Sequence, residues 1–284
     1  MPLHPSPPED MAALTDAYAH TARAILDLAG SLRPGEEDLP TACPGWTVHD
    51  QLAHIVSLEA WVQGETPPDL DVSDRPHVRG ELGALVERFL ESRRGRSRDE
   101  LVEELDQLVA ARLDHLGAES TSPDDDATGP FGPTTLHGLT QNRLFDLWIH
   151  EQDIREAIGR PGNLDSAGAA HVLSQVFRAL PKAVARTAGA PAGDAVILDV
   201  TGPVMGRAGV RVEERDGAAH GIPLFTGEGH DGAADGGTVT TITLSTQALT
   251  RRAAGRVTTE DTHYTVTGDE DVARRVLDAL TIAP

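Results

Sequence analysis

Two patterns of hydrophobic residues divide the chain. From about residue 11 to residue 188, apolar residues recur every three to four positions, which is the spacing of amphipathic helices. The first such stripe is formed by Leu14, Tyr18, Ala22, Ile25 and Leu28. After the turn-forming residues 189–193, the pattern changes to short β-rich runs separated by turn residues.

The first region therefore predicts a series of helices. Thr47 and Asp50 follow the Pro44-Gly45 turn with the spacing of a capping box, so a helix is expected to begin at Thr47 and to end near Gly64. Three consecutive aspartates and a Gly-Pro-Phe-Gly-Pro run indicate a loop over Ser120–Pro133. The other helices are expected around the first stripe and over Glu81–Leu90, Asp99–Leu116, Thr134–Ile158 and Asp165–Thr187.

The second region predicts a small mixed domain. Strands are expected over Ala195–Thr201, Ala208–Glu213, Thr238–Leu244 and His263–Thr267, and short helices over Ser245–Ala254 and Asp269–Leu280. The predicted fold class is α+β, with a helical bundle over residues 11–190 followed by a small α+β domain over residues 191–284.

Charge narrows the range of partners. The 284 residues include 24 Lys and Arg against 45 Asp and Glu, a net charge of −21, which disfavours binding to nucleic acid or to anionic membranes. No apolar run approaches the ~20 residues that a membrane span needs. No Lys or Arg precedes Arg23, so a signal peptide is not indicated and we expect a soluble, cytoplasmic protein.

Three residues have the spacing of a metal site. Asp146 and His150 are four residues apart, so they share one face of a helix that is otherwise apolar around them. His54 lies on the apolar stripe of a second helix, together with Leu58 and Trp61. A histidine from one helix and a carboxylate-x3-histidine pair from another can form a metal site in a bundle, and three ligands with open positions are typical of catalytic sites.

The same residues have simpler interpretations. An inward histidine is commonly satisfied by a backbone carbonyl, and Asp146 could pair with Arg143 or another arginine. Cys43 is the single cysteine, so no intrachain disulfide can form. Its position between Ala42 and Pro44 favours a structural role over a nucleophilic one.

Two motifs carry a resemblance to a known family. Residues 41–54 (TACPGWTVHDQLAH) and 148–155 (WIHEQDIR) resemble motifs of the DinB-like, mycothiol-dependent maleylpyruvate isomerase family. The segments 255–256 and 266–269 are similar to its small sterol-carrier-like domain. The resemblance implies a DinB-like four-helix bundle with the metal ligands His54, Asp146 and His150, although the family commonly has Glu in place of Asp146. Two histidines and a carboxylate suit zinc first, and also nickel, iron or manganese.

The resemblance also implies a reaction. Mycothiol would be the cosubstrate, and a metal-activated thiol would attack an electrophilic small molecule, as in an S-transferase. The alternative within the family is cis-trans isomerisation of maleylpyruvate-like unsaturated keto acids, and a non-catalytic metal- or ligand-binding bundle is an alternative of another class. The family also has an arginine from its C-terminal domain near the site. Arg256 is the candidate for this residue, and Arg251 and Arg252 are close rivals. The simpler interpretation of all three is that they are solvated side chains at the end of a helix.

Overall fold

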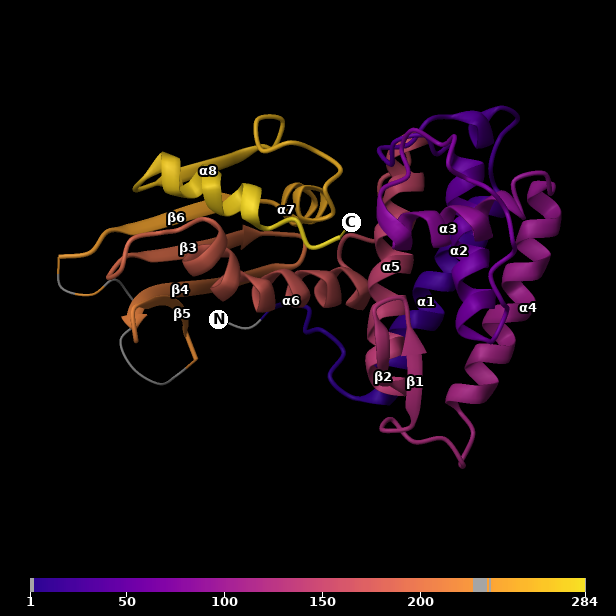
Figure 1. Cartoon of the computed structure of the whole chain (residues 1–284), viewed down its shortest axis with the longest axis horizontal. Coiled ribbons are helices and arrows are strands. Elements are labelled where there is room, and N and C mark those ends of the chain that lie inside the picture. Colours follow the sequence, from indigo (N-terminus) through magenta and orange to yellow (C-terminus); the bar gives the residue numbers. More distant parts are fainter. Residues whose placement is uncertain (1–2, 227–233, 235, 284) are drawn as a thin grey trace. The chain divides into compact units, whose positions relative to one another are not determined.

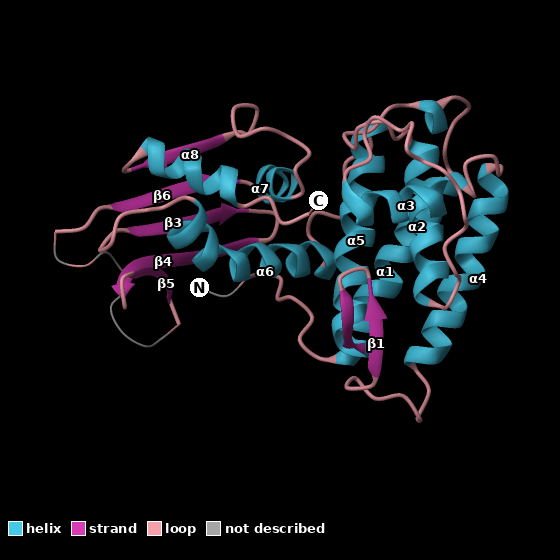
Figure 2. Cartoon of the chain, viewed as in Figure 1, coloured by secondary structure: helices cyan, strands magenta, loops and turns pink. Residues whose placement is uncertain are grey.

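The chain forms two compact units. The computed structural model describes residues 3–226, 234 and 236–283. One unit is Pro8–Gly162, and the other is Asn163–Pro284 together with Met1–Pro7. The first is a helical bundle and the second combines helices with a sheet, which confirms the predicted α+β class (Figure 2).

Residues 8–162, all of which are described, form a bundle in which four helices make a closed ring of contacts (Figure 1). In this ring α1 packs against α4 and α5, and α2 packs against the same two helices. A further helix, α3, lies against α2. The bounds are α1 (Met11–Gly30), η1 (Glu36–Asp38), α2 (Val48–Val62), α3 (Gly80–Glu91), α4 (Arg98–Leu116) and α5 (Leu136–Ala157).

The ends of α2 and α5 are fixed by local sequence. The Thr47 side chain accepts a hydrogen bond from the Asp50 backbone N–H, and the Asp50 carboxylate accepts one from the Thr47 backbone N–H, so the capping box is present. Thr135 caps α5 in the same way by accepting from the Gly138 N–H. All residues of α2 from Asp50 to Ala60 are buried, which makes α2 the central helix of the bundle.

The Ser120–Pro133 segment is not entirely a loop. Its last part forms β1 (Asp126–Gly129), which pairs antiparallel with β2 (Gly132–Thr135). Gly132 has a φ of +103°, a conformation that glycine adopts without strain and that closes this hairpin. The strands were missed because they contain few of the β-branched and aromatic residues that mark strands in a sequence.

The boundary between the units lies at Gly162–Asn163 instead of near residue 190. The last helix of the helical region, α6 (Ala167–Lys182), continues into η2 (Ala183–Thr187), and both pack against strands of the second unit. A helical period shows that one face of a helix is buried but not which element covers it. The domain ranges 11–190 and 191–284 therefore assign α6 to the wrong side of the boundary.

Within the described part of the second unit, the strands form a five-stranded sheet in the order β5-β4-β3-β6-β7. The central strands β3 and β6 are parallel, and the other neighbours are antiparallel. One strand, β5, was not expected because its sequence AAHGIPL has a weak β pattern. The bounds are β3 (Ala195–Thr201), β4 (Met205–Arg215), β5 (Ala218–Leu224), β6 (Val239–Leu244), α7 (Thr246–Ala253), β7 (Tyr264–Thr267) and α8 (Glu270–Ala279).

The N-terminal segment belongs to this second unit. His4 pairs with Met205 through two backbone hydrogen bonds, and the buried Leu3 lies against Gly206. The chain thus begins in the second unit, passes through the bundle and returns. Among the residues that the structure describes, no helix combines the length and the hydropathy needed to cross a bilayer.

Close packing between α6 and β5 gives a stability prediction. A Cβ on Gly221 would lie 2.4 Å from the Pro181 carbonyl oxygen, so Gly221→Ala should lower the free energy of unfolding by about 1–3 kcal/mol through overpacking. Gly83→Ala on α3 is the control, because its Cβ would meet only Val78 at 3.8 Å and alanine favours a helix. Urea denaturation measures both, and equal stability of the two variants would contradict the packing argument.

Candidate metal centre

The structure brings His54, Asp146 and His150 together, with one ligand atom from each lying within 4.8 Å of the others. His54 Nε2 is 3.6 Å from Asp146 Oδ1, and His150 Nε2 is 3.5 Å from the same oxygen. Two ligand atoms that are each ~2.1 Å from a tetrahedral ion lie about 3.4 Å apart. The two distances from Asp146 are therefore close to the separation of two ligand atoms on a single ion.

Unsatisfied polar atoms support the same interpretation. His54 and His150 are buried, and neither ring nitrogen of His54 has a hydrogen-bond partner among the described residues. A buried polar atom without a partner is costly unless a ligand satisfies it. The expected alternative of a core histidine satisfied by a backbone carbonyl does not apply to His54, and the residues present fit a metal ion.

Protonation of the histidines differs. Burial, together with the neighbouring charge of His150, lowers the pKa of His54 to about 4, so His54 is neutral at neutral pH. Burial opposes the charge on His150, but the Asp146 carboxylate outweighs it and raises the pKa of His150 well above its usual value. Burial likewise opposes the charge on Asp146, whose pKa is nevertheless held well below its usual value by His150 and Arg143.

The second oxygen of Asp146 is held by a buried arginine. Arg143 Nη1 donates to Asp146 Oδ2 at 2.8 Å, and Arg143 Nε donates to Glu59 Oε2 at 3.2 Å. The side chains of Arg143 and Glu59 are 1% and 0% exposed. Asp146 thus pairs with Arg143 and faces both histidines at once, so one carboxylate oxygen is left for a metal ion.

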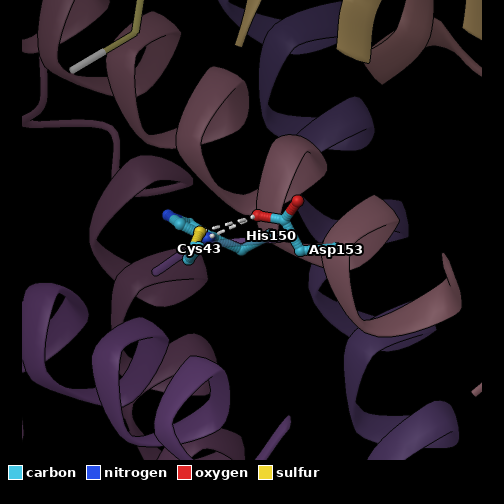
Figure 3. A group of neighbouring side chains, drawn as sticks. All are labelled: Cys43, His150 and Asp153. Atoms are coloured by element: carbon cyan, nitrogen blue, oxygen red, sulfur yellow. Dashed lines mark hydrogen bonds and ion pairs between the residues drawn. The ribbon is translucent and has the colours of Figure 1, made fainter. Parts of the chain in front are cut away.

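A further polar group lies behind His150 (Figure 3). Its Nδ1 is 3.3 Å from Asp153 Oδ2, and Cys43 Sγ is 3.4 Å from the same oxygen. Together, Cys43, His150 and Asp153 are a second set of potential metal ligands. The sequence analysis missed Asp153, although its position three residues after His150 places both on one helix face. Cys43 is buried, as a structural role requires.

An aromatic ring covers the two histidines. The Trp46 ring centroid is 4.9 Å from that of His54 and 6.1 Å from that of His150. Trp46 is half-buried, and its indole N–H donates to Glu87 Oε2 at 3.2 Å. Glu87 is buried and also binds His77 and Arg94. Trp46 was not predicted to be part of the site, although it lies in the same motif as His54.

The arginines expected from the second unit differ in their contacts. Arg252 donates to the Thr259 and Thr281 hydroxyls and to the Asp278 carbonyl, so it holds its own unit together. Arg251 is buried at the end of α7. Arg256 follows Gly255, which has a φ of +70°, and donates to the Ala254 carbonyl.

The chain resembles known proteins in the sequence of its bundle and in its fold. Residues 18–155 match the family model described as the mycothiol maleylpyruvate isomerase N-terminal domain. The crystal structure of the mycothiol-dependent maleylpyruvate isomerase has 17% sequence identity and a TM-score of 0.55, covering 91% of this chain and 93% of that chain. Its histidine-to-alanine mutant has 16% identity, a TM-score of 0.52 and the same coverage. No curated protein sequence matches the chain.

The chain combines an α+β fold with a buried polar centre in its helical bundle. Within the bundle, residues 18–155 match the N-terminal domain of the mycothiol maleylpyruvate isomerase family. The two solved structures are only 17% and 16% identical in sequence to this chain. For the residues outside 18–155, the similarity therefore shows the fold alone.

Removing Arg143 should strongly destabilise the bundle. Arg143→Gln leaves the Glu59 carboxylate buried without its cation, and breaking a buried pair costs roughly 3–5 kcal/mol. The control is Arg33→Gln, since the Arg33 side chain is 79% exposed and lies 3.9 Å from Glu36, a geometry worth less than about 1 kcal/mol. The free energy of unfolding in urea is the measurement, and similar values for the two variants would contradict the role of Arg143.

Proposed function

We propose that the chain is a mycothiol-dependent metalloenzyme that isomerises an unsaturated keto acid, with His54, Asp146 and His150 as ligands of a divalent ion. The observation that carries the proposal is the convergence of these three side chains in a bundle of this family. Zinc is the first choice because two histidines, one carboxylate and an open position are a common zinc donor set. Nickel, iron and manganese suit the same donors.

The surroundings of the cluster suit thiol chemistry. A bound divalent cation would favour the thiolate form of an adjacent thiol and polarise a carbonyl. The only anionic ligand of the cluster is Asp146, whose charge is shared with Arg143. A divalent ion with Asp146 as its one anionic ligand would keep a net positive charge on its ligand shell, which would favour binding of a thiolate. The Trp46 ring lies beside both histidines and adds an apolar surface next to the cluster.

Two reactions begin with the same step, in which the thiolate adds to an electrophilic carbon. In an isomerisation the double bond becomes single, rotates, and re-forms as the thiol leaves, so no thiol is consumed. In an S-transfer the adduct is the product, and one thiol is consumed per turnover. Similarity to a maleylpyruvate isomerase favours isomerisation over the S-transfer that the motifs alone placed first.

Metal content and turnover test the function together. We expect about one ion per purified chain in the wild type, because the three side chains form one set of ligands. We also expect cis-trans isomerisation of maleylpyruvate without consumption of mycothiol, because three protein ligands leave open positions on the ion for reactants. His54→Ala, Asp146→Ala and His150→Ala should each lose the ion and the activity. Elemental analysis and thiol titration are the measurements, with the exposed His115→Ala on α4 as the control.

Each outcome has a separate meaning. Stoichiometric metal in His150→Ala would overturn the ligand assignment. Loss of one thiol per turnover would establish the S-transferase alternative. Bound metal without any thiol reaction would leave a non-catalytic metal-binding bundle.

Arg256 is proposed to bind the substrate carboxylate, because a guanidinium makes a bidentate contact with that group. Arg256→Gln should raise KM for maleylpyruvate by roughly 10-fold, which corresponds to the loss of about 1.4 kcal/mol of binding. Arg251→Gln is the comparison, and initial rates over a range of substrate concentrations are the measurement. An effect confined to Arg251→Gln would move the role to that residue.

A further inference from the structure

We propose that Asp153 is a positioning residue that keeps the proton of His150 on Nδ1 and so leaves Nε2 for the metal ion. This inference rests on the metal centre proposed above, and it concerns how that centre is oriented. The observation behind it is that both ring nitrogens of His150 have a carboxylate oxygen nearby, on different residues. Nε2 faces Asp146 Oδ1 at 3.5 Å, and Nδ1 faces Asp153 Oδ2 at 3.3 Å.

The two carboxylates are not equivalent. Asp146 already accepts a hydrogen bond from Arg143, and its side chain is 24% exposed. Asp153 is completely buried, and its Oδ2 lies near two donors, the His150 ring and the Cys43 thiol (Figure 3). An ionised carboxylate can only accept hydrogen bonds, so a neutral imidazole facing Asp153 must carry its proton on Nδ1. The lone pair of Nε2 then faces His54 and Asp146.

The geometry is fixed by the helix itself. His150 and Asp153 are three residues apart on α5, so their side chains meet on one face without any contribution from a loop. His54 differs, because its only ion-pair contact in the described part of the chain is that of Nε2 with Asp146 Oδ1. Of the two histidines, His150 is therefore the one oriented by a second polar group, as metal-binding histidines commonly are.

The same three residues could instead bind a second ion, since Cys43, His150 and Asp153 are themselves a set of potential ligands. That arrangement would require both the thiol proton and the Nδ1 proton to be lost, and His150 would bridge two ions. The 3.4 Å contact between Cys43 Sγ and Asp153 Oδ2 is already explained by a thiol donating to a carboxylate. Positioning of His150 therefore accounts for the group without a further ion.

The experiment uses the full-length protein with zinc as the probe. Competition with a chromophoric chelator gives the zinc affinity and the number of sites, and nitrogen-15 NMR of the zinc-loaded wild type locates the His150 ring proton. We expect one zinc site, a proton on Nδ1, and zinc binding roughly 10- to 100-fold weaker in Asp153→Asn, whose amide can also present N–H groups to the ring. Asp114→Asn, at an exposed position on α4, is the matched control and should bind zinc as the wild type does.

Several results would overturn the proposal. These are unchanged zinc affinity in a folded Asp153→Asn, a second zinc at Cys43, or coordination of zinc through His150 Nδ1. If Asp153→Asn does not fold, the position of the ring proton in the wild type decides. Absence of zinc binding in the wild type would overturn the metal centre as well, whereas a lack of thiol turnover with these results intact would affect only the proposed reaction.

Discussion

The buried guanidinium of Arg143 is the interaction on which the interior of the bundle depends. It lies between Glu59 on α2 and Asp146 on α5, and so it joins the two helices that supply the polar cluster. Taking charges out of water costs several kcal/mol per ion, and the cost is offset only when the partners are correctly placed. The relative rotation of α2 and α5 is therefore constrained, and with it the position of His54 relative to His150.

A common arrangement supports three of the side chains around the polar cluster. Asp146 has Arg143 behind it, His150 has Asp153, and the Trp46 indole has Glu87. In each case a buried charged residue fixes one atom of the side chain and leaves the opposite side directed to the cluster. Orientation of the site is thus provided by rigid helices and their buried ions, which limits the conformational entropy lost when a ligand binds.

Local rules predicted much of this molecule from its sequence. The i, i+4 spacing of Asp146 and His150 and the inward stripe containing His54 were sufficient to bring the three residues together, because helix geometry fixes which side chains share a face. Glu59 and Asp153 were not identified, since their partners depend on how helices rotate and pack. The assignment of α6 also escaped prediction, because burial against a sheet leaves the same sequence period as burial in a bundle, and β5 was missed because its sequence has a weak β pattern.

The path of the chain has a consequence for how the two units can be separated. Since His4 pairs with Met205 while the bundle spans Pro8–Gly162, the bundle is inserted between two parts of the other unit. Two covalent connections therefore join the units, and cleavage of the backbone at only one of them would leave a single covalently linked molecule. Excision of the bundle would leave the second unit as two fragments that have to associate, with the N-terminal fragment contributing Leu3 to its core.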